Sequence, residues 1–230
     1  MRASLLSPLL SAFLLLAAAF APAHAQDAAL PGLTEGTEYR LIEDGKPYRP
    51  VAGKIEVAEI FAYWCPHCAH FAPMLETWTR TLPASARFVA VPLATDPDDA
   101  WARAFFAAEA SNSLAVLHPL LFAAVHETGA LPKGPTESQV SAFVARVPGV
   151  NQAAYKAALA DNDALQKKIA AAYQFALRSD IPGTPSLVVN GKYLVLGNSY
   201  ENLLANARKI VLALTPKKPA TRKPAAKPRT

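Results

Sequence analysis

Cys65-Pro66-His67-Cys68 contains both cysteines of this 230-residue chain. A disulfide between residues three apart closes a very small loop, and the stabilisation gained from loop closure grows with loop length. The pair is therefore a poor structural crosslink, and its C-x-x-C spacing favours a redox-active dithiol that cycles with a disulfide. A metal site or an incidental short disulfide are the alternatives, although structural zinc usually takes four ligands.

The residues around the motif predict a junction between a strand and a helix. Residues 55–64 are apolar, β-branched and aromatic, as in a strand. Residues 66–80 carry apolar side chains at helical spacing, and Pro66 suits the first helical position. A helix N-terminus offers orphan N–H groups and a partial positive charge, so we expect a lowered pKa for Cys65. Cys68 lies one turn further on and should be more buried.

This motif and a distant second segment resemble one protein family. Phe61-x-x-Trp64-Cys65-Pro66-His67-Cys68 is similar to the active-site motif of the DsbA family of bacterial periplasmic thiol:disulfide oxidoreductases. The stretch Gly183-Thr184-Pro185-Ser186-Leu187-Val188-Val189-Asn190-Gly191-Lys192-Tyr193 resembles the second landmark of that family and of the thioredoxin superfamily. The resemblance runs over about residues 39–214. It implies an α/β protein, a thioredoxin fold interrupted by an inserted all-helical domain.

Hydrophobic periodicity predicts the other elements. Further strands are expected at 39–42, 87–91, 186–189 and 193–196. Asn190-Gly191 predicts a hairpin turn, and Ser199 is the expected N-cap of a closing helix over 199–214. The pattern of residues 96–180 predicts several consecutive helices. Because a crossover between parallel strands needs only one helix, most of these residues should form a separate helical lobe. Its last helix should share a stripe of Leu165, Ile169, Tyr173 and Leu177.

The predicted organisation has five parts: a signal peptide (1–25), the first part of a thioredoxin-like domain (26–95), an inserted helical domain (96–180), the second part of the thioredoxin-like domain (181–214) and a basic, disordered tail rich in Pro, Ala and Lys (215–230). Arg2, the apolar run 9–21 and Ala23-His24-Ala25 are typical of a secretory signal. An uncleaved anchor is the alternative, although the run is short for a membrane span. Export predicts the periplasm, an oxidising compartment.

The formal net charge of +5 arises from the tail, which holds six basic and no acidic residues. The body between signal and tail has slightly more acidic than basic residues, so nucleic acid is not an expected partner. The tail lacks the apolar residues to build a core. It could contact anionic lipid or cell-wall polymer, or simply be solvated.

Cys65 is the predicted nucleophile. A substrate thiolate would attack Cys65 of the oxidised protein and displace Cys68, and a second substrate thiolate would then release Cys65. The resemblance implies that a stabilised Cys65 thiolate makes the disulfide a good oxidant. Because the Cys65–Cys68 disulfide is itself the redox group, we expect no separate cofactor.

His67 and Glu59 are the predicted tuning residues. A cationic or N–H-donating imidazole at His67 would favour the Cys65 thiolate; an exposed histidine without a partner is the alternative. Strand alternation places Glu59 on an apolar face, where burial would raise its pKa and let it relay protons to or from Cys68. The family has a buried acid at the matching position. An exposed or lysine-paired Glu59 is the alternative, and Glu56, on the other face, is the weaker candidate.

Three residues are expected to contact substrate. The superfamily places a cis-proline loop against the active-site sulfurs, which implies a cis Thr184–Pro185 bond; cis peptides occur mainly at X-Pro bonds, and a trans bond is the alternative. Thr184 departs from the valine of many DsbA-like proteins, and its hydroxyl could alter thiolate stability and substrate release. Trp64 could offer an apolar surface to unfolded polypeptide, whereas Phe61 is a core residue.

No metal is expected: His70 should lie on the surface, and His118 and His126 should be packing or surface residues.

The predicted function is oxidation of cysteine pairs in newly exported proteins by a monomer. Its partners would be unfolded polypeptides with free thiols and a DsbB-like membrane quinone reductase that reoxidises it. A disulfide reductase or isomerase is the first alternative, favoured by Thr184. A noncatalytic chaperone or a metal-binding module is the second.

Overall fold

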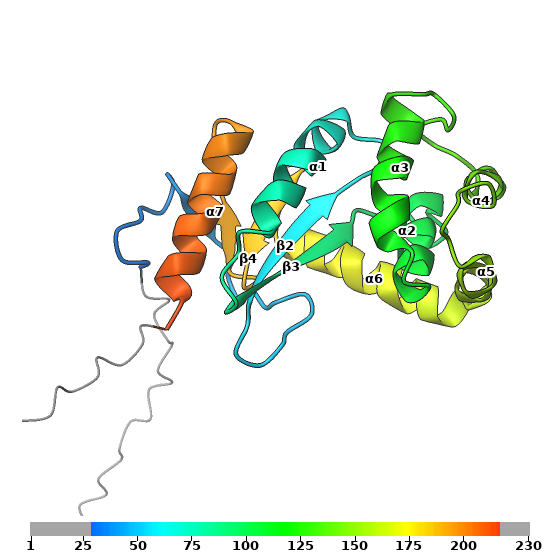
Figure 1. Cartoon of the computed structure of the whole chain (residues 1–230). Coiled ribbons are helices and arrows are strands. Elements are labelled where there is room, and N and C mark those ends of the chain that lie inside the picture. Colours follow the sequence, from blue (N-terminus) through cyan, green and yellow to red (C-terminus); the bar gives the residue numbers. More distant parts are fainter. Residues whose placement is uncertain (1–28, 217–230) are drawn as a thin grey trace, which may run out of the picture.

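Figure 1 shows the computed structural model, which describes residues 29–216. The predicted signal peptide (1–25) and residues 217–230 of the predicted tail lie outside the described residues. Within residues 29–216, no helix combines the length and apolar character needed to cross a membrane.

A five-stranded mixed sheet forms the first layer, in the order β1-β5-β4-β2-β3. Only β2 and β3 run parallel; the other neighbours are antiparallel. The turn between β4 and β5 has positive φ at Asn190 (51°) and Gly191 (66°), as the predicted hairpin requires. The predicted strand over 55–64 ends earlier, at Phe61, so three residues separate it from Cys65. The strands are β1 (Tyr39–Leu41), β2 (Ile55–Phe61), β3 (Ala86–Pro92), β4 (Ser186–Val189) and β5 (Tyr193–Val195).

Helices α1 (Pro66–Thr79) and α7 (Tyr200–Leu214) lie side by side against this sheet (Figure 1). Phe71 of α1 and Ile210 of α7 are fully buried in one apolar cluster with Val57 of β2. Ser199 caps α7 by accepting a hydrogen bond from the Asn202 N–H at 3.2 Å, which confirms the predicted N-cap. The α1 helix therefore begins within the cysteine motif, at Pro66, and it packs against α7.

Five helices follow β3 before the chain returns to the sheet at β4: α2 (Ala100–Ala110), α3 (Leu114–His126), α4 (Glu137–Val144), α5 (Gln152–Ala160) and α6 (Asn162–Arg178). In Figure 1, α2 to α5 gather beside the sheet, and α6 leads back to it. The parallel crossover assumed from the sequence is wrong, because β4 pairs antiparallel with β2. The direction of β4 depends on the point at which α6 brings the chain back to the sheet. The local sequence of β4 does not encode that point.

The predicted stripe on α6 is correct only in its first half. Leu165 and Ile169 are buried, but Tyr173 is 44% and Leu177 61% exposed. Steps of four residues drift around a helix that has 3.6 residues per turn. The buried face therefore continues through other residues, namely Ala172, Phe175 and Ala176.

Candidate active site

Cys65 lies at the N-cap of α1, with Pro66 following it in the first helical turn. Both cysteines are free thiols, so the structure represents the reduced pair. Cys68 is completely buried and Cys65 is 5% exposed, in the predicted order. The Cys65 thiol donates a hydrogen bond to the Thr184 carbonyl oxygen, with Sγ and O 3.3 Å apart.

The two sulfurs have opposite pKa shifts. Burial raises the pKa of Cys65, but hydrogen bonds from the Thr184 side chain, from Cys68 and from the His67 backbone outweigh it, and the net pKa lies below the usual value. Burial dominates at Cys68 and raises its pKa far above normal, with further increases from the negative charges of Glu59 and Cys65. Cys65 is thus the better thiolate, and Cys68 strongly prefers its proton.

Glu59 lies on β2, close enough to Cys68 to affect its pKa electrostatically. It is 3% exposed, and burial raises its pKa to about 8 from 4.5, in agreement with the sequence-based expectation. At neutral pH the folded protein therefore holds Glu59 mainly as a neutral acid. Glu56 faces the other way, where its carboxylate pairs with Arg87 at 2.7 Å and anchors a loop by accepting the N–H groups of Tyr48 and Arg49.

The Thr184–Pro185 bond is cis, as expected, and both residues lie beside the cysteine motif. Thr184 and Pro185 line a groove of about 560 Å³ together with His67 and Tyr200. Trp64 is partly buried on another side of the motif, where it lines a hollow of about 490 Å³ with Trp101 of α2. Trp64 and His67, which precede and follow Cys65 in the sequence, thus line two separate concave surfaces.

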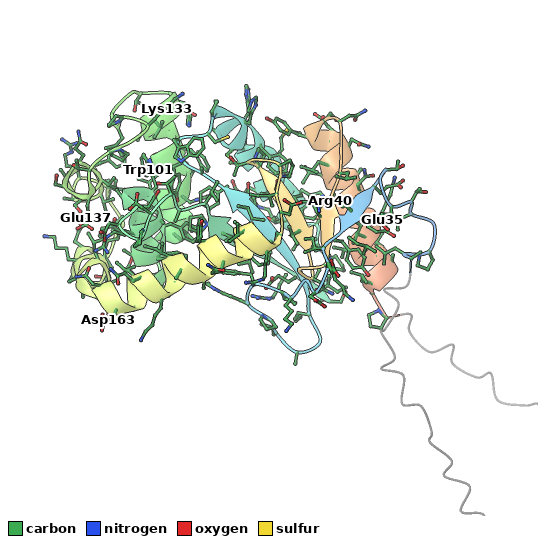
Figure 2. All side chains as sticks on the ribbon, turned by 180° about the vertical axis from the view of Figure 1, so that it is seen from behind. Glu35, Arg40, Trp101, Lys133, Glu137 and Asp163 are labelled. Atoms are coloured by element: carbon green, nitrogen blue, oxygen red, sulfur yellow. The ribbon has the colours of Figure 1, made fainter. Side chains whose placement is uncertain are left out.

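Tyr63, two residues before Cys65, is a site residue that sequence reasoning missed. Its hydroxyl lies 2.8 Å from Nδ1 of His118, and its carbonyl oxygen lies 2.7 Å from Nε2 of His126. The ring of Trp101 also packs against Tyr63, with centroids 5.2 Å apart. Figure 2 labels Trp101 on α2 and Lys133 in the loop between α3 and α4; the Trp101 indole N–H donates to the Lys133 carbonyl oxygen at 2.7 Å.

The two histidines of α3 are packing residues, as expected, but they pack against the segment that carries Cys65. Two turns of helix separate His118 from His126, so both can face the same neighbour. That spacing was the available signal; the sequence did not identify Tyr63 as the neighbour. Among the described residues no group of three histidine, cysteine or acidic side chains is arranged to hold a metal ion, and His70 is exposed.

His67 is exposed, but it has a partner. Its Nδ1 lies 3.2 Å from the hydroxyl of Tyr200, the first residue of α7, and that hydroxyl also donates to the His67 carbonyl oxygen at 3.2 Å. No local sequence pattern pointed to Tyr200, because 133 residues separate it from His67.

A mixed sheet with a cysteine pair at the start of α1 and a cis-proline beside it defines a thiol:disulfide oxidoreductase of the thioredoxin type. The family model of the DSBA-like thioredoxin domain matches residues 56–209, and the chain belongs to this family. The predicted fold class, with its helical insertion, and the predicted enzyme class are thereby confirmed.

Curated relatives and solved structures agree with this assignment. The chain is 34% identical over 161 residues to the thiol:disulfide interchange protein DsbA of Pseudomonas syringae pv. tomato, an alignment covering 66% of this chain and 73% of the relative. It is 32% identical over 188 residues to DsbA of Pseudomonas aeruginosa, covering 80% and 84%. The crystal structure of the oxidoreductase DsbA from Xylella fastidiosa has a TM-score of 0.72 at 36% identity, covering 80% of this chain and 97% of that one.

Proposed function

We propose that this enzyme oxidises cysteine pairs of exported proteins in the periplasm by donating its Cys65–Cys68 disulfide. The opposite pKa shifts of the two sulfurs carry the proposal. A stabilised Cys65 thiolate favours the reduced enzyme, so the oxidised enzyme readily gives up its disulfide. Export is supported by the signal-like sequence at 1–25.

The first step forms a mixed disulfide. A substrate thiolate attacks Sγ of Cys65; a new S–S bond forms to the substrate while the Cys65–Cys68 bond breaks, and its electron pair goes to Cys68. Cys68 then takes up a proton, because its pKa is strongly raised. Glu59, protonated at neutral pH and electrostatically coupled to Cys68, is the proposed proton donor.

The second step releases the product. A second substrate thiolate attacks the substrate sulfur of the mixed disulfide, the substrate disulfide forms, and Cys65 leaves as a thiolate. The hydrogen bonds that lower the Cys65 pKa make it a good leaving group. The substrate has lost two electrons and the enzyme has gained them as a dithiol.

The partners follow from this cycle. Unfolded polypeptides with free thiols are the substrates, and the groove beside Pro185 with the hollow beside Trp64 offers concave surfaces on which such a chain could lie. A DsbB-like membrane protein would accept the two electrons and pass them to a quinone. The enzyme would act as a monomer with no cofactor beyond its own disulfide.

The deciding experiment is the redox equilibrium of Cys65–Cys68 in glutathione buffers, read by thiol alkylation or Trp64 fluorescence. We expect a potential well above that of thioredoxin, together with rapid oxidation of a reduced, unfolded test polypeptide. A thioredoxin-like reducing potential would instead assign the protein to the reductases or isomerases, which Thr184 would then help to explain.

A further inference from the structure

The contact between Tyr200 and His67 connects the closing helix to the cysteine motif. Tyr200 begins α7, and His67 stands between the two cysteines in the first turn of α1. The Tyr200 ring packs on Phe71 with centroids 5.1 Å apart, which fixes the direction of the hydroxyl. The hydroxyl then meets both the side chain and the backbone of His67, each at 3.2 Å.

The hydrogen-bond roles in this contact can be assigned. A carbonyl oxygen only accepts, so the single hydroxyl proton of Tyr200 is donated to the His67 carbonyl. The tyrosine oxygen is then free to accept, and the bond to His67 requires a proton on Nδ1. A bond that needs Nδ1–H excludes the neutral tautomer protonated only at Nε2.

The hydroxyl is also close enough to the sulfurs to respond to their charge. Burial raises the pKa of Tyr200, and the negative charges of Cys65 and Cys68 raise it further. Tyr200 therefore remains a neutral phenol when Cys65 is a thiolate, and it keeps the proton that it donates to His67.

We propose that Tyr200 is a positioning residue that holds His67 with a proton on Nδ1 and thereby stabilises the reduced cysteine pair. Tyr200 acts through His67 and does not touch the reacting sulfurs in this role. The proposal rests on the proposed function and on the sequence-based expectation that the His67 imidazole favours the Cys65 thiolate.

The test is to measure, for Tyr200→Phe and for wild type, the equilibrium constant of thiol–disulfide exchange between the cysteine pair and glutathione. Phenylalanine retains the ring that packs on Phe71 and loses only the hydroxyl. A hydrogen bond contributes a net of about 0.5–1.5 kcal/mol in typical proteins, so we expect the equilibrium to move roughly two- to twelvefold toward the disulfide form. Tyr173→Phe is the matched control, because Tyr173 is exposed on α6, and it should leave the equilibrium unchanged.

A double-mutant cycle separates this role from simple packing. In a His67→Ala background, Tyr200→Phe should change the equilibrium by less than about 1.5-fold, because the residue through which it acts is gone. A shift of equal size in both backgrounds, or no shift in the single variant, would overturn the proposal. The oxidised and reduced forms of Tyr200→Phe should also lose unfolding free energy unequally, with the larger loss in the reduced form.

Two quantities from the same experiment separate the role of Tyr200 from the role of the protein as an oxidant. The wild-type equilibrium, measured in the same series, reports whether the protein is an oxidant. The ratio between Tyr200→Phe and wild type reports on Tyr200 alone, whatever the absolute potential.

Discussion

The hydroxyl of Tyr63 lies 2.8 Å from Nδ1 of His118, which bonds the segment leading into Cys65 directly to α3. Burial lowers the pKa of His118 to about 4, so its imidazole is neutral near pH 7 and Nδ1 can accept the tyrosine proton. His126 donates from Nε2 to the carbonyl oxygen of the same tyrosine. The helical insertion thus holds the backbone of the cysteine motif in place through two histidines.

This contact predicts an acid-sensitive fold. Between pH 6.5 and about 4, the unfolded chain takes up a proton at His118 that the folded protein does not, so the free energy of unfolding falls as the pH is lowered. The expected loss is about 2 to 3 kcal/mol. His118→Gln retains an acceptor for Tyr63 and cannot titrate, so its stability relative to wild type should rise as the pH falls through this window. Denaturant unfolding from pH 4 to 7 measures this, and a constant difference would refute it.

Glu59 predicts the opposite dependence. Its pKa of about 8 in the folded protein, against 4.5 ordinarily, means that the folded state holds a proton that the unfolded chain releases. The free energy of unfolding therefore falls as the pH rises from 4.5 to about 8. Glu59→Gln should remove this loss and stabilise the reduced protein by on the order of 4 kcal/mol at pH 8. It should also slow release of Cys68 from the disulfide, because the proposed proton donor is gone.

Glu56 provides a matched comparison on the same strand. Its carboxylate accepts backbone N–H groups at 2.5 and 2.9 Å and pairs with Arg87, so Glu56→Gln should cost about 1 to 3 kcal/mol of unfolding free energy at neutral pH. The two glutamates are three residues apart in sequence, yet the same substitution should move stability in opposite directions. Equal effects in thermal or denaturant unfolding would contradict the distinct environments described above.

Features that depend on residues close together in the sequence were predictable, and contacts between residues far apart in the sequence were not. The strand-to-helix junction at Cys65, the Asn190-Gly191 turn and the Ser199 cap depend on neighbouring residues, and each was predictable. The Tyr63–His118 and Tyr200–His67 contacts join residues 55 and 133 positions apart, and no local pattern encodes them. Glu59 is buried as expected, but alternation alone does not explain this, because every residue of β2 is buried, including Glu56 on the opposite face.

The Thr184 hydroxyl is expected to affect the stability of the Cys65 thiolate and the redox equilibrium of the cysteine pair. Its side chain is among the groups that lower the pKa of Cys65 against the effect of burial. Thr184→Val removes the hydroxyl and retains the carbonyl that accepts from the Cys65 thiol. We expect a less stable thiolate and a shift of the glutathione equilibrium toward the disulfide form by roughly two- to twelvefold, the effect of one hydrogen bond. Thiolate absorbance during a pH titration reports the first effect, and an unchanged titration would exclude a role for the hydroxyl.

The unequal burial of the two sulfurs predicts which one meets the substrate. Cys65 keeps some exposure beside the Pro185 groove, whereas Cys68 is inaccessible. A Cys68→Ser variant, activated at Cys65 with a small aromatic disulfide, should therefore form a long-lived mixed disulfide with a reduced polypeptide. Cys65→Ser should form almost none under the same conditions, because its remaining thiol is buried and has a raised pKa. Non-reducing electrophoresis with mass spectrometry measures the two adducts, and comparable yields would reverse the assignment of Cys65 as the nucleophile.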